Sequence, residues 1–207
     1  MNRTRIGLAI GAVVLGCGIG VAAAYMFDVF PRGPEATATR EGGPGGPFTL
    51  TAHTGERMSD ADFRGRYTLV FFGFTYCPDV CPTTLADMHA ALEALGGDAA
   101  QVQPLFVSVD PKRDTPEQLA AYVAAFDDRI IGLTGTEAEI EAVARAYGVY
   151  YEYVPDETDP EFYLVNHTAA IYFMDREGRF IRVFSYQTPT DEMVAEIRAV
   201  MEQDATS

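Results

Sequence analysis

Hydrophobic positions follow two different patterns along the chain. The first is an unbroken apolar run from Ile6 to Phe27, which carries no charged side chain. As an α-helix this run would measure about 33 Å, close to the thickness of the hydrocarbon core of a bilayer. From about residue 48 onward, short apolar runs alternate with polar segments, as in a folded domain. We therefore expect a transmembrane anchor over residues 6–30 and a globular domain over residues 48–207.

The charges beside the apolar run predict its orientation. Arg3 and Arg5 precede the run and Asp28 follows it, and the positively charged flank of a transmembrane helix stays in the cytoplasm. Residues 1–5 would then form a cytoplasmic stub, and the globular domain would lie in the periplasm. A segment this short before the run cannot be a mitochondrial transit peptide, which favours a bacterial inner membrane.

Two other kinds of N-terminal segment fit parts of this pattern. The sequence Val14-Leu15-Gly16-Cys17 resembles a lipobox, at which a lipoprotein is cleaved, but the apolar run continues well beyond Cys17. A cleaved signal peptide would have a shorter apolar run that ends at a small-residue cleavage site. An uncleaved single-pass helix fits best, and both kinds of processing stay open as alternatives.

A segment rich in proline and glycine separates the two regions. Residues 31–47 read PRGPEATATREGGPGGP, with four prolines and five glycines. Such a composition favours neither helix nor strand and behaves as a flexible coil. We expect it to be a tether of about 20–25 Å between the anchor and the domain.

Periodicity in the domain predicts strands and helices in alternation. Strands are expected where β-branched and aromatic residues run together, and helices where Leu or Met recurs at helical spacing behind a capping residue. After a short hairpin near Phe48, the expected strands cover residues 67–74, 102–109, 130–133, 167–174 and 180–185, and the expected helices cover 82–95, 115–126, 136–147 and 190–203. Alternating units predict parallel strands with helices on both faces, and the last hairpin adds antiparallel strands. The expected fold is α/β, a thioredoxin-like mixed sheet flanked by helices.

Net charge excludes one broad class of function. The chain has 15 Lys and Arg against 30 Asp and Glu, a net charge of −15. A polyanion is repelled by phosphate backbones, so we expect no binding to nucleic acid. With three cysteines in 207 residues, the chain is also not a scaffold held together by disulfides.

Cys77 and Cys81 stand where the expected strand 67–74 meets the next helix. Backbone N–H groups and the helix dipole at such a place favour thiolates. At this spacing the two sulfur atoms can bond each other or share one metal ion, and an oxidising compartment permits both. The plainer alternative is a pair of buried thiols or a static disulfide.

Of the histidines, only His167 is expected beside the cysteines. It opens the expected strand 167–174, where thioredoxins carry the loop that faces their active cysteines. His53 lies in an expected surface turn and should be solvated. His89 lies about 12 Å along the helix axis from Cys81, too far to share a ligand with it.

Two thiolates and one imidazole favour copper over other metals. Thiolates suit copper(I), and an imidazole also admits copper(II). A structural zinc site usually has four protein ligands, whereas only Cys77, Cys81 and His167 are expected to converge. Among nearby acids, Asp114 is expected to form a turn. Asp110 is either a partner of the ligands or structural, and Asp79 is either solvated or a docking contact.

Four motifs in order resemble the Sco/SenC/PrrC family of membrane-anchored copper proteins that assemble cytochrome c oxidase. They are FGFTYCPDVCP at 72–82, DPKRDTP at 110–116, LTGT at 133–136 and YLVNH at 163–167. The resemblance implies Cys77, Cys81 and His167 as copper ligands, and the dinuclear copper centre of oxidase subunit II as the destination. The family commonly has aspartate where this chain has Asn166, which bears on copper affinity.

Two functions therefore compete for the same thiols. One is a metallochaperone that binds copper and passes it on by ligand exchange. The other is an enzyme, a thiol–disulfide oxidoreductase that reduces the copper-binding cysteines of the target, with Cys77 and Cys81 as its redox-active pair. The Cys-x₃-Cys spacing, and His167 in the place of a cis-proline, favour metal binding.

Overall fold

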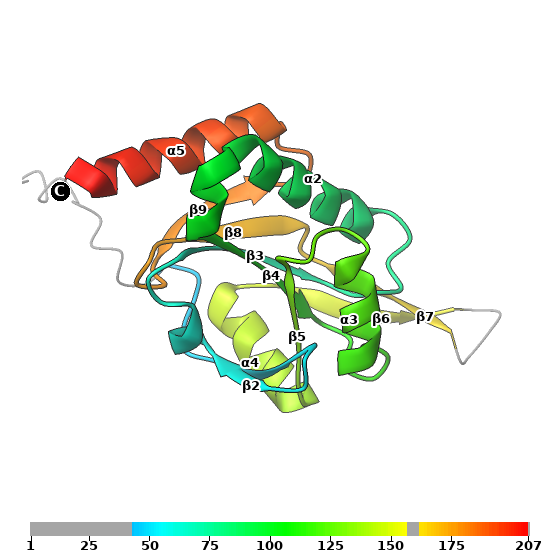
Figure 1. Cartoon of the computed structure of the whole chain (residues 1–207). Coiled ribbons are helices and arrows are strands. Elements are labelled where there is room, and N and C mark those ends of the chain that lie inside the picture. Colours follow the sequence, from blue (N-terminus) through cyan, green and yellow to red (C-terminus); the bar gives the residue numbers. More distant parts are fainter. Residues whose placement is uncertain (1–42, 157–161, 207) are drawn as a thin grey trace, which may run out of the picture. The chain divides into compact units, whose positions relative to one another are not determined.

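The computed structural model describes residues 43–156 and 162–206 (Figure 1). The strands are β1 (Thr49–Ala52), β2 (Arg57–Ser59), β3 (Tyr67–Gly73), β4 (Val102–Ser108), β5 (Ile131–Thr134), β6 (Tyr151–Pro155), β7 (Tyr163–His167), β8 (Ala170–Met174) and β9 (Phe180–Ser185). The α-helices are α2 (Val80–Leu95), α3 (Pro116–Ala124), α4 (Glu137–Tyr147) and α5 (Thr190–Thr206), and short 3-10 helices cover Asp60–Phe63 and Gly96–Gln101.

One mixed sheet organises these elements. Its strands lie in the order β2-β1-β5-β4-β3-β8-β9. The central strands β3, β4 and β5 are parallel, while β1 and β8 pair antiparallel with their neighbours. Every residue of β3 and β4 is buried, as expected for strands that are covered on both faces. The predicted mixed sheet of parallel and antiparallel strands is confirmed, and the structure places a hairpin at each of its edges.

Side chains of β3 alternate between two helical layers. Phe71 contacts Phe106, which in turn contacts Tyr122 of α3, on the face that α2 and α5 also cover. Phe72 points the other way and packs on Tyr147 of α4. Figure 1 shows α5 alongside α2 over one face and α4 beyond the sheet. The hydrophobic core is therefore divided into two layers by the sheet.

Threonines cap the first turns of the expected helices 115–126 and 136–147. The Thr115 side chain accepts a hydrogen bond from the backbone N–H of Gln118 at the start of α3. Thr136 does the same for Glu139 at the start of α4, and the Glu139 carboxylate in turn accepts a hydrogen bond from the Thr136 N–H. Each pair satisfies backbone groups that the first turn of a helix leaves open, so these boundaries could be predicted locally.

The predicted strand 167–174 is wrong as a single element. The structure ends β7 at His167 and begins β8 at Ala170, so His167 closes a strand rather than opening one. β7 pairs with β6 in a two-stranded ribbon that is separate from the main sheet. This ribbon extends to the right in Figure 1. Exposed Val154 and Leu164 face each other across this ribbon and blur its alternation of apolar and polar residues, which hid it from the sequence pattern.

The expected tether ends against the domain. Residues 43–47 are described, and the Gly45 N–H donates to the carbonyl of Ala146 at 2.9 Å. The predicted anchor at residues 6–30 and Cys17 lie outside the described residues. Within residues 43–156 and 162–206, no helix is both long and apolar enough to cross a bilayer.

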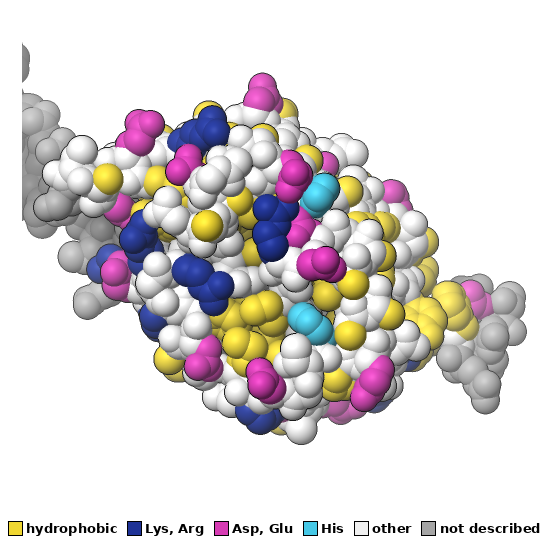
Figure 2. Space-filling view, viewed as in Figure 1, with side chains coloured by type: hydrophobic (Ala, Val, Ile, Leu, Met, Phe, Trp, Pro, Cys, Tyr) yellow, Lys and Arg dark blue, Asp and Glu magenta, His cyan; other side chains and the backbone are white. Residues whose placement is uncertain are grey.

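Acidic side chains are not gathered into one patch on the face shown in Figure 2. There Asp and Glu are interspersed with Lys and Arg. Several of the basic side chains form ion pairs, such as Arg57 with Glu139 and Arg179 with Asp175. The net charge of the chain therefore does not by itself mark a docking face in this view.

Candidate metal centre

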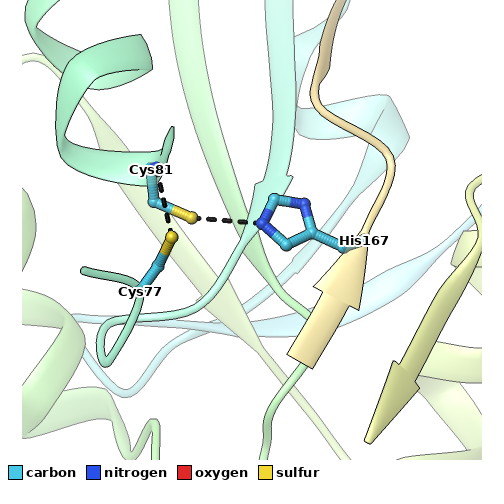
Figure 3. A group of neighbouring side chains, drawn as sticks. All are labelled: Cys77, Cys81 and His167. Carbon is cyan, nitrogen blue, oxygen red and sulfur yellow. Dashed lines mark hydrogen bonds between the residues drawn. The ribbon is translucent and has the colours of Figure 1, made fainter. Parts of the chain in front are cut away.

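Cys77, Cys81 and His167 come together at one end of the central strands (Figure 3). The Cys81 Sγ lies 3.3 Å from Nε2 of His167, and the Cys81 backbone N–H donates to the Cys77 Sγ at 3.3 Å. The donor atoms of the three side chains all lie within 4.8 Å of one another. The residues that the sequence singled out therefore form one cluster, contributed by the loop after β3, the first turn of α2 and the end of β7.

A glycine lets the helix approach the strand closely at this point. β3 ends at Gly73, where an added Cβ would lie 2.8 Å from the Cys81 Sγ and 2.8 Å from a ring atom of Phe106. Real Cβ atoms do not approach sulfur or carbon so closely, so a larger residue would displace the cysteine. Cys81 is fully buried as a result, whereas Cys77 is only partly buried.

The environments of the two thiols differ sharply. A hydrogen bond from the Cys81 side chain lowers the pKa of Cys77 to about 4, with help from the backbone N–H groups of Asp79 and Cys81, against the effect of burial. Burial and the neighbouring Cys77 thiolate raise the pKa of Cys81 far above its usual value. At neutral pH the pair therefore holds one proton, on Cys81, and Cys77 is a thiolate.

The imidazole of His167 is oriented as a ligand. Its Nδ1 lies 3.1 Å from the carbonyl oxygen of Thr168, and because a carbonyl can only accept, Nδ1 carries the hydrogen. In the neutral ring this leaves the lone pair on Nε2, the atom that faces the Cys81 sulfur. Phe71 and Phe74 contact the ring edge-on at centroid distances of 6.0 and 5.8 Å and hold it in place.

The donor set fits copper. Two sulfurs and one imidazole nitrogen suit copper(I), and the nitrogen extends the range to copper(II). Within the described part of the chain, no fourth His, Cys, Asp or Glu belongs to this cluster. A closed structural zinc site would require one more protein ligand.

Two buried carboxylates support the cluster from outside it. Asp114 accepts hydrogen bonds from the Thr75 N–H at 3.0 Å, from the Thr75 hydroxyl at 2.6 Å and from Ser108 at 2.6 Å. It therefore fixes the backbone just before Cys77 and does more than form a turn. Asp110 accepts from Arg113 and from the Tyr163 hydroxyl, two side chains that lie beside the cluster. Asp79 is exposed between the cysteines.

Asn166 points away from the cluster. It is exposed, as are its register partner Glu152 and the neighbouring Leu164, whereas His167 and Val165 face inward. Successive side chains of a strand point to opposite faces. A carboxylate at position 166 would therefore lie opposite Glu152 and would not reach the thiols.

The remaining histidines have other partners. The prediction that His53 is solvated is wrong, because its Nδ1 accepts the Gly132 N–H at 3.0 Å and ties the β1–β2 turn to β5. His89 is separate from the cysteines, as predicted, and lies with Glu93 and Asp127 in a second cluster of ligand-type groups. Arg129 donates to both of those carboxylates, so this cluster is an ion-pair network.

Sequence reasoning missed two residues beside the cluster. Arg113 and Tyr163 stack on each other, with 3.7 Å between the guanidinium carbon and the ring centroid. Both belong to motifs that the sequence showed, DPKRDTP and YLVNH. Only the unpredicted ribbon brings the two motifs together, so no local signal could have paired them.

Known proteins resemble this chain over most of the described domain. The sequence model of the SCO1/SenC family matches residues 36–202. A human protein named Protein SCO1 homolog, mitochondrial, is 44% identical over 159 residues, which cover 76% of this chain and 52% of that protein. The match thus spans about half the length of this curated relative.

Solved structures agree with these matches. ScoI from Bradyrhizobium japonicum with copper bound is 44% identical, with a TM-score of 0.70, and the match covers 75% of this chain and 98% of that one. ScoI from Arabidopsis thaliana with copper bound is 38% identical, with a TM-score of 0.72, over 77% and 98%. The resemblance carried by the four motifs is confirmed, and the chain belongs to the SCO1/SenC family.

Proposed function

We propose that this protein is a copper chaperone of the bacterial periplasm. It would bind copper through Cys77, Cys81 and His167 and deliver it to the dinuclear copper centre of cytochrome c oxidase subunit II. The observation that carries this proposal is the convergence of two sulfurs and one Nε2 within 4.8 Å from three separate elements. Two relatives whose structures contain copper, one of them bacterial, support the choice of metal.

The protonation of the cluster suits the capture and release of a soft cation. Cys77 is ionised at neutral pH and partly exposed, so it offers the first ligand. Cys81 must lose its proton to bind, which makes copper binding release a proton and weaken as the pH falls. The Nε2 lone pair of His167 already faces the sulfurs. Delivery would proceed by ligand exchange, with thiolates of the target replacing the ligands one at a time.

Membrane attachment completes the proposal. The apolar run over residues 6–30, with Arg3 and Arg5 before it, would form a single transmembrane helix and keep the domain in the periplasm. Tethering to the membrane raises the effective concentration of the domain near a membrane-bound oxidase. Residues 31–47 would form the tether between that helix and the domain.

A second function is favoured by the asymmetry of the thiols. An accessible thiolate beside a buried thiol is typical of a thiol–disulfide oxidoreductase. In that reaction Cys77 attacks a disulfide of the target, and Cys81 then resolves the mixed disulfide. The target gains two electrons, one proton from Cys81 and one proton from water, and a Cys77–Cys81 disulfide forms.

One experiment separates the two functions. Full-length protein is purified reduced in detergent, as wild type and as Cys77→Ser, Cys81→Ser and His167→Ala, and each is assayed for bound copper and for reduction of a small disulfide peptide. A chaperone loses copper(II) affinity in all three variants, and its His167→Ala variant keeps copper(I) and disulfide reduction. If His167→Ala binds copper(II) like wild type, the ligand assignment is wrong and the oxidoreductase becomes the better account.

A further inference from the structure

The loop between β4 and α3, residues 109–115, contacts both parts of the chain that carry the metal-binding side chains. These parts are the loop after β3, with Cys77, and the β6–β7 ribbon, with His167. The ribbon is not part of the main sheet, so no ladder of backbone hydrogen bonds joins β7 itself to the strand that leads to the cysteines. Contacts made by residues 109–115 are candidates for that role.

On the cysteine side, the loop holds the residues just before Cys77. Asp114 accepts the Thr75 N–H at 3.0 Å and the Thr75 hydroxyl at 2.6 Å. The guanidinium carbon of Arg113 lies 4.8 Å from the ring centroid of Tyr76, the residue next to Cys77. These contacts hold in place Thr75 and Tyr76, the two residues that precede Cys77.

On the histidine side, Arg113 makes two contacts with Tyr163 of β7. Its Nη1 donates to the Tyr163 carbonyl at 2.9 Å, and its guanidinium carbon lies 3.7 Å from the centroid of the Tyr163 ring. The Tyr163 hydroxyl donates to Asp110 at 2.7 Å, and Arg113 Nε donates to the same carboxylate. A second tie runs from the Tyr153 hydroxyl to the Val109 carbonyl at 2.9 Å.

Arg113 also reaches the imidazole through one aromatic ring. Its guanidinium carbon lies 5.9 Å from the centroid of Phe74, and Phe74 meets His167 edge-on at 5.8 Å. The guanidinium thus lies among Tyr76 of the cysteine loop, Tyr163 of the ribbon and Phe74 beneath the histidine. The charge of Arg113 is paired with the fully buried Asp110. Arg113 therefore acts on the cluster mainly by holding its neighbours in place, and less through its electric field.

We propose that Arg113 is a positioning residue for metal binding, which holds β7 against the cysteine loop so that His167 Nε2 meets the two sulfurs. The proposal rests on the ligand set of the proposed function. Copper(I) can be held by two thiolates, whereas copper(II) depends more on the imidazole. Loss of Arg113 should therefore weaken copper(II) binding more than copper(I) binding.

The test is a double-mutant cycle in full-length protein, with copper(II) affinity measured by competition titration and the ligand nitrogen followed by electron paramagnetic resonance. Arg113→Lys keeps the positive charge, but an ammonium group cannot stack on the Tyr163 ring while it also hydrogen-bonds the Tyr163 carbonyl and Asp110. We expect it to weaken copper(II) about tenfold and to reduce the nitrogen coupling. In a His167→Ala background the same change should cost less than about twofold, because the group it positions is gone.

Other variants make the outcome decisive. Arg145→Lys, on the exposed surface of α4, is the matched control and should bind copper(II) like wild type. Equal losses from Arg113→Lys with and without His167, or no loss with His167 present, would overturn the proposal. If Arg113→Lys does not fold, Tyr163→Phe provides the test, because it removes only the hydrogen bond from the Tyr163 hydroxyl to Asp110. We expect this variant to bind copper(II) about threefold more weakly. Unchanged affinity in Tyr163→Phe would then overturn it. Normal copper binding by His167→Ala alone would instead refute the ligand set of the proposed function.

Discussion

Cys81 Sγ lies 3.3 Å from His167 Nε2, although 86 positions separate the two residues in the chain. Strands β4 and β5 of the main sheet, helices α3 and α4, and then the β6–β7 ribbon lie between them in the chain. The contact therefore exists only once the sheet is assembled, and any change that shifts the ribbon acts on the cluster from a distance. The predictions below follow from that dependence.

His167→Ala separates metal binding from thiol chemistry. Removing the imidazole takes away one of three donors but leaves both sulfurs, so copper(II) binding should weaken by at least about tenfold while copper(I) remains bound. Both thiols should stay titratable, and reduction of a disulfide peptide should continue at a similar rate. Parallel metal titrations in the two oxidation states provide the check. Equal loss of affinity for copper(I) and copper(II) would argue against a specific role of the imidazole in copper(II) binding.

Alkylation of Cys77 should hardly depend on pH over the neutral range. Its pKa is lowered to about 4, so the reactive thiolate is present above that value and is lost only as the pH falls through it. We expect the rate with iodoacetamide to change little from about pH 8 down to about pH 5, whereas an ordinary thiol would slow by orders of magnitude.

Cys77→Ser provides the control for that measurement. It leaves Cys81 as the only thiol in the described residues, and burial keeps the pKa of Cys81 high. Its alkylation should be slow and should rise with pH. A Cys77 rate that climbs tenfold per pH unit through neutrality would show that the thiolate is not stabilised.

Gly73→Ala should disturb both stability and the cluster. The new methyl group would lie 2.8 Å from the Cys81 sulfur, so either α2 or the side chain must move. We expect a loss of about 1–3 kcal/mol in the free energy of unfolding, together with weaker copper binding. Gly97→Ala is the matched control, because nothing lies within 4 Å of a Cβ at that position. Denaturant titration of both variants tests the difference, and equal stability would mean that the contact is easily relieved.

Asp114→Asn should loosen the loop before Cys77. The carboxylate accepts three hydrogen bonds from Thr75 and Ser108, and an amide cannot accept all three because its nitrogen is a donor. The expected cost is about 1–3 kcal/mol in the free energy of unfolding. Asp128→Asn, at an exposed position, should change stability little. A stable Asp114→Asn variant would show that the loop is held by other contacts.

Asn166→Asp should have little effect on copper. The side chain faces away from the thiols and opposite Glu152, so a new carboxylate adds a like-charge pair on the outer face of the ribbon. Copper(II) affinity should change by less than about threefold. A tenfold gain would show that charge at this position does reach the metal, as the sequence comparison with the family suggested.

Most of the fold and the members of the cluster could be predicted from sequence because their signals are local. β3 and β4 are rich in apolar, β-branched and aromatic residues, Thr115 and Thr136 are capping residues, and the two cysteines sit at a strand–helix junction. The ribbon could not be predicted, because exposed Val154 and Leu164 break the alternation of apolar and polar residues in β6 and β7. For the same reason the role of Arg113 was hidden, since its partner Tyr163 is brought to it only by the ribbon.

The unequal burial of the two cysteines gives the proposed transfer a direction. Cys81 lies wholly inside the domain, and Cys77 is partly open to solvent. An incoming protein can therefore bring its own sulfur only to the outer side of a bound ion, where Cys77 is the ligand to be displaced. The Cys81 sulfur would stay bound to the ion until the incoming sulfur has bound it. The ion would therefore pass from one protein to the other without being released into water.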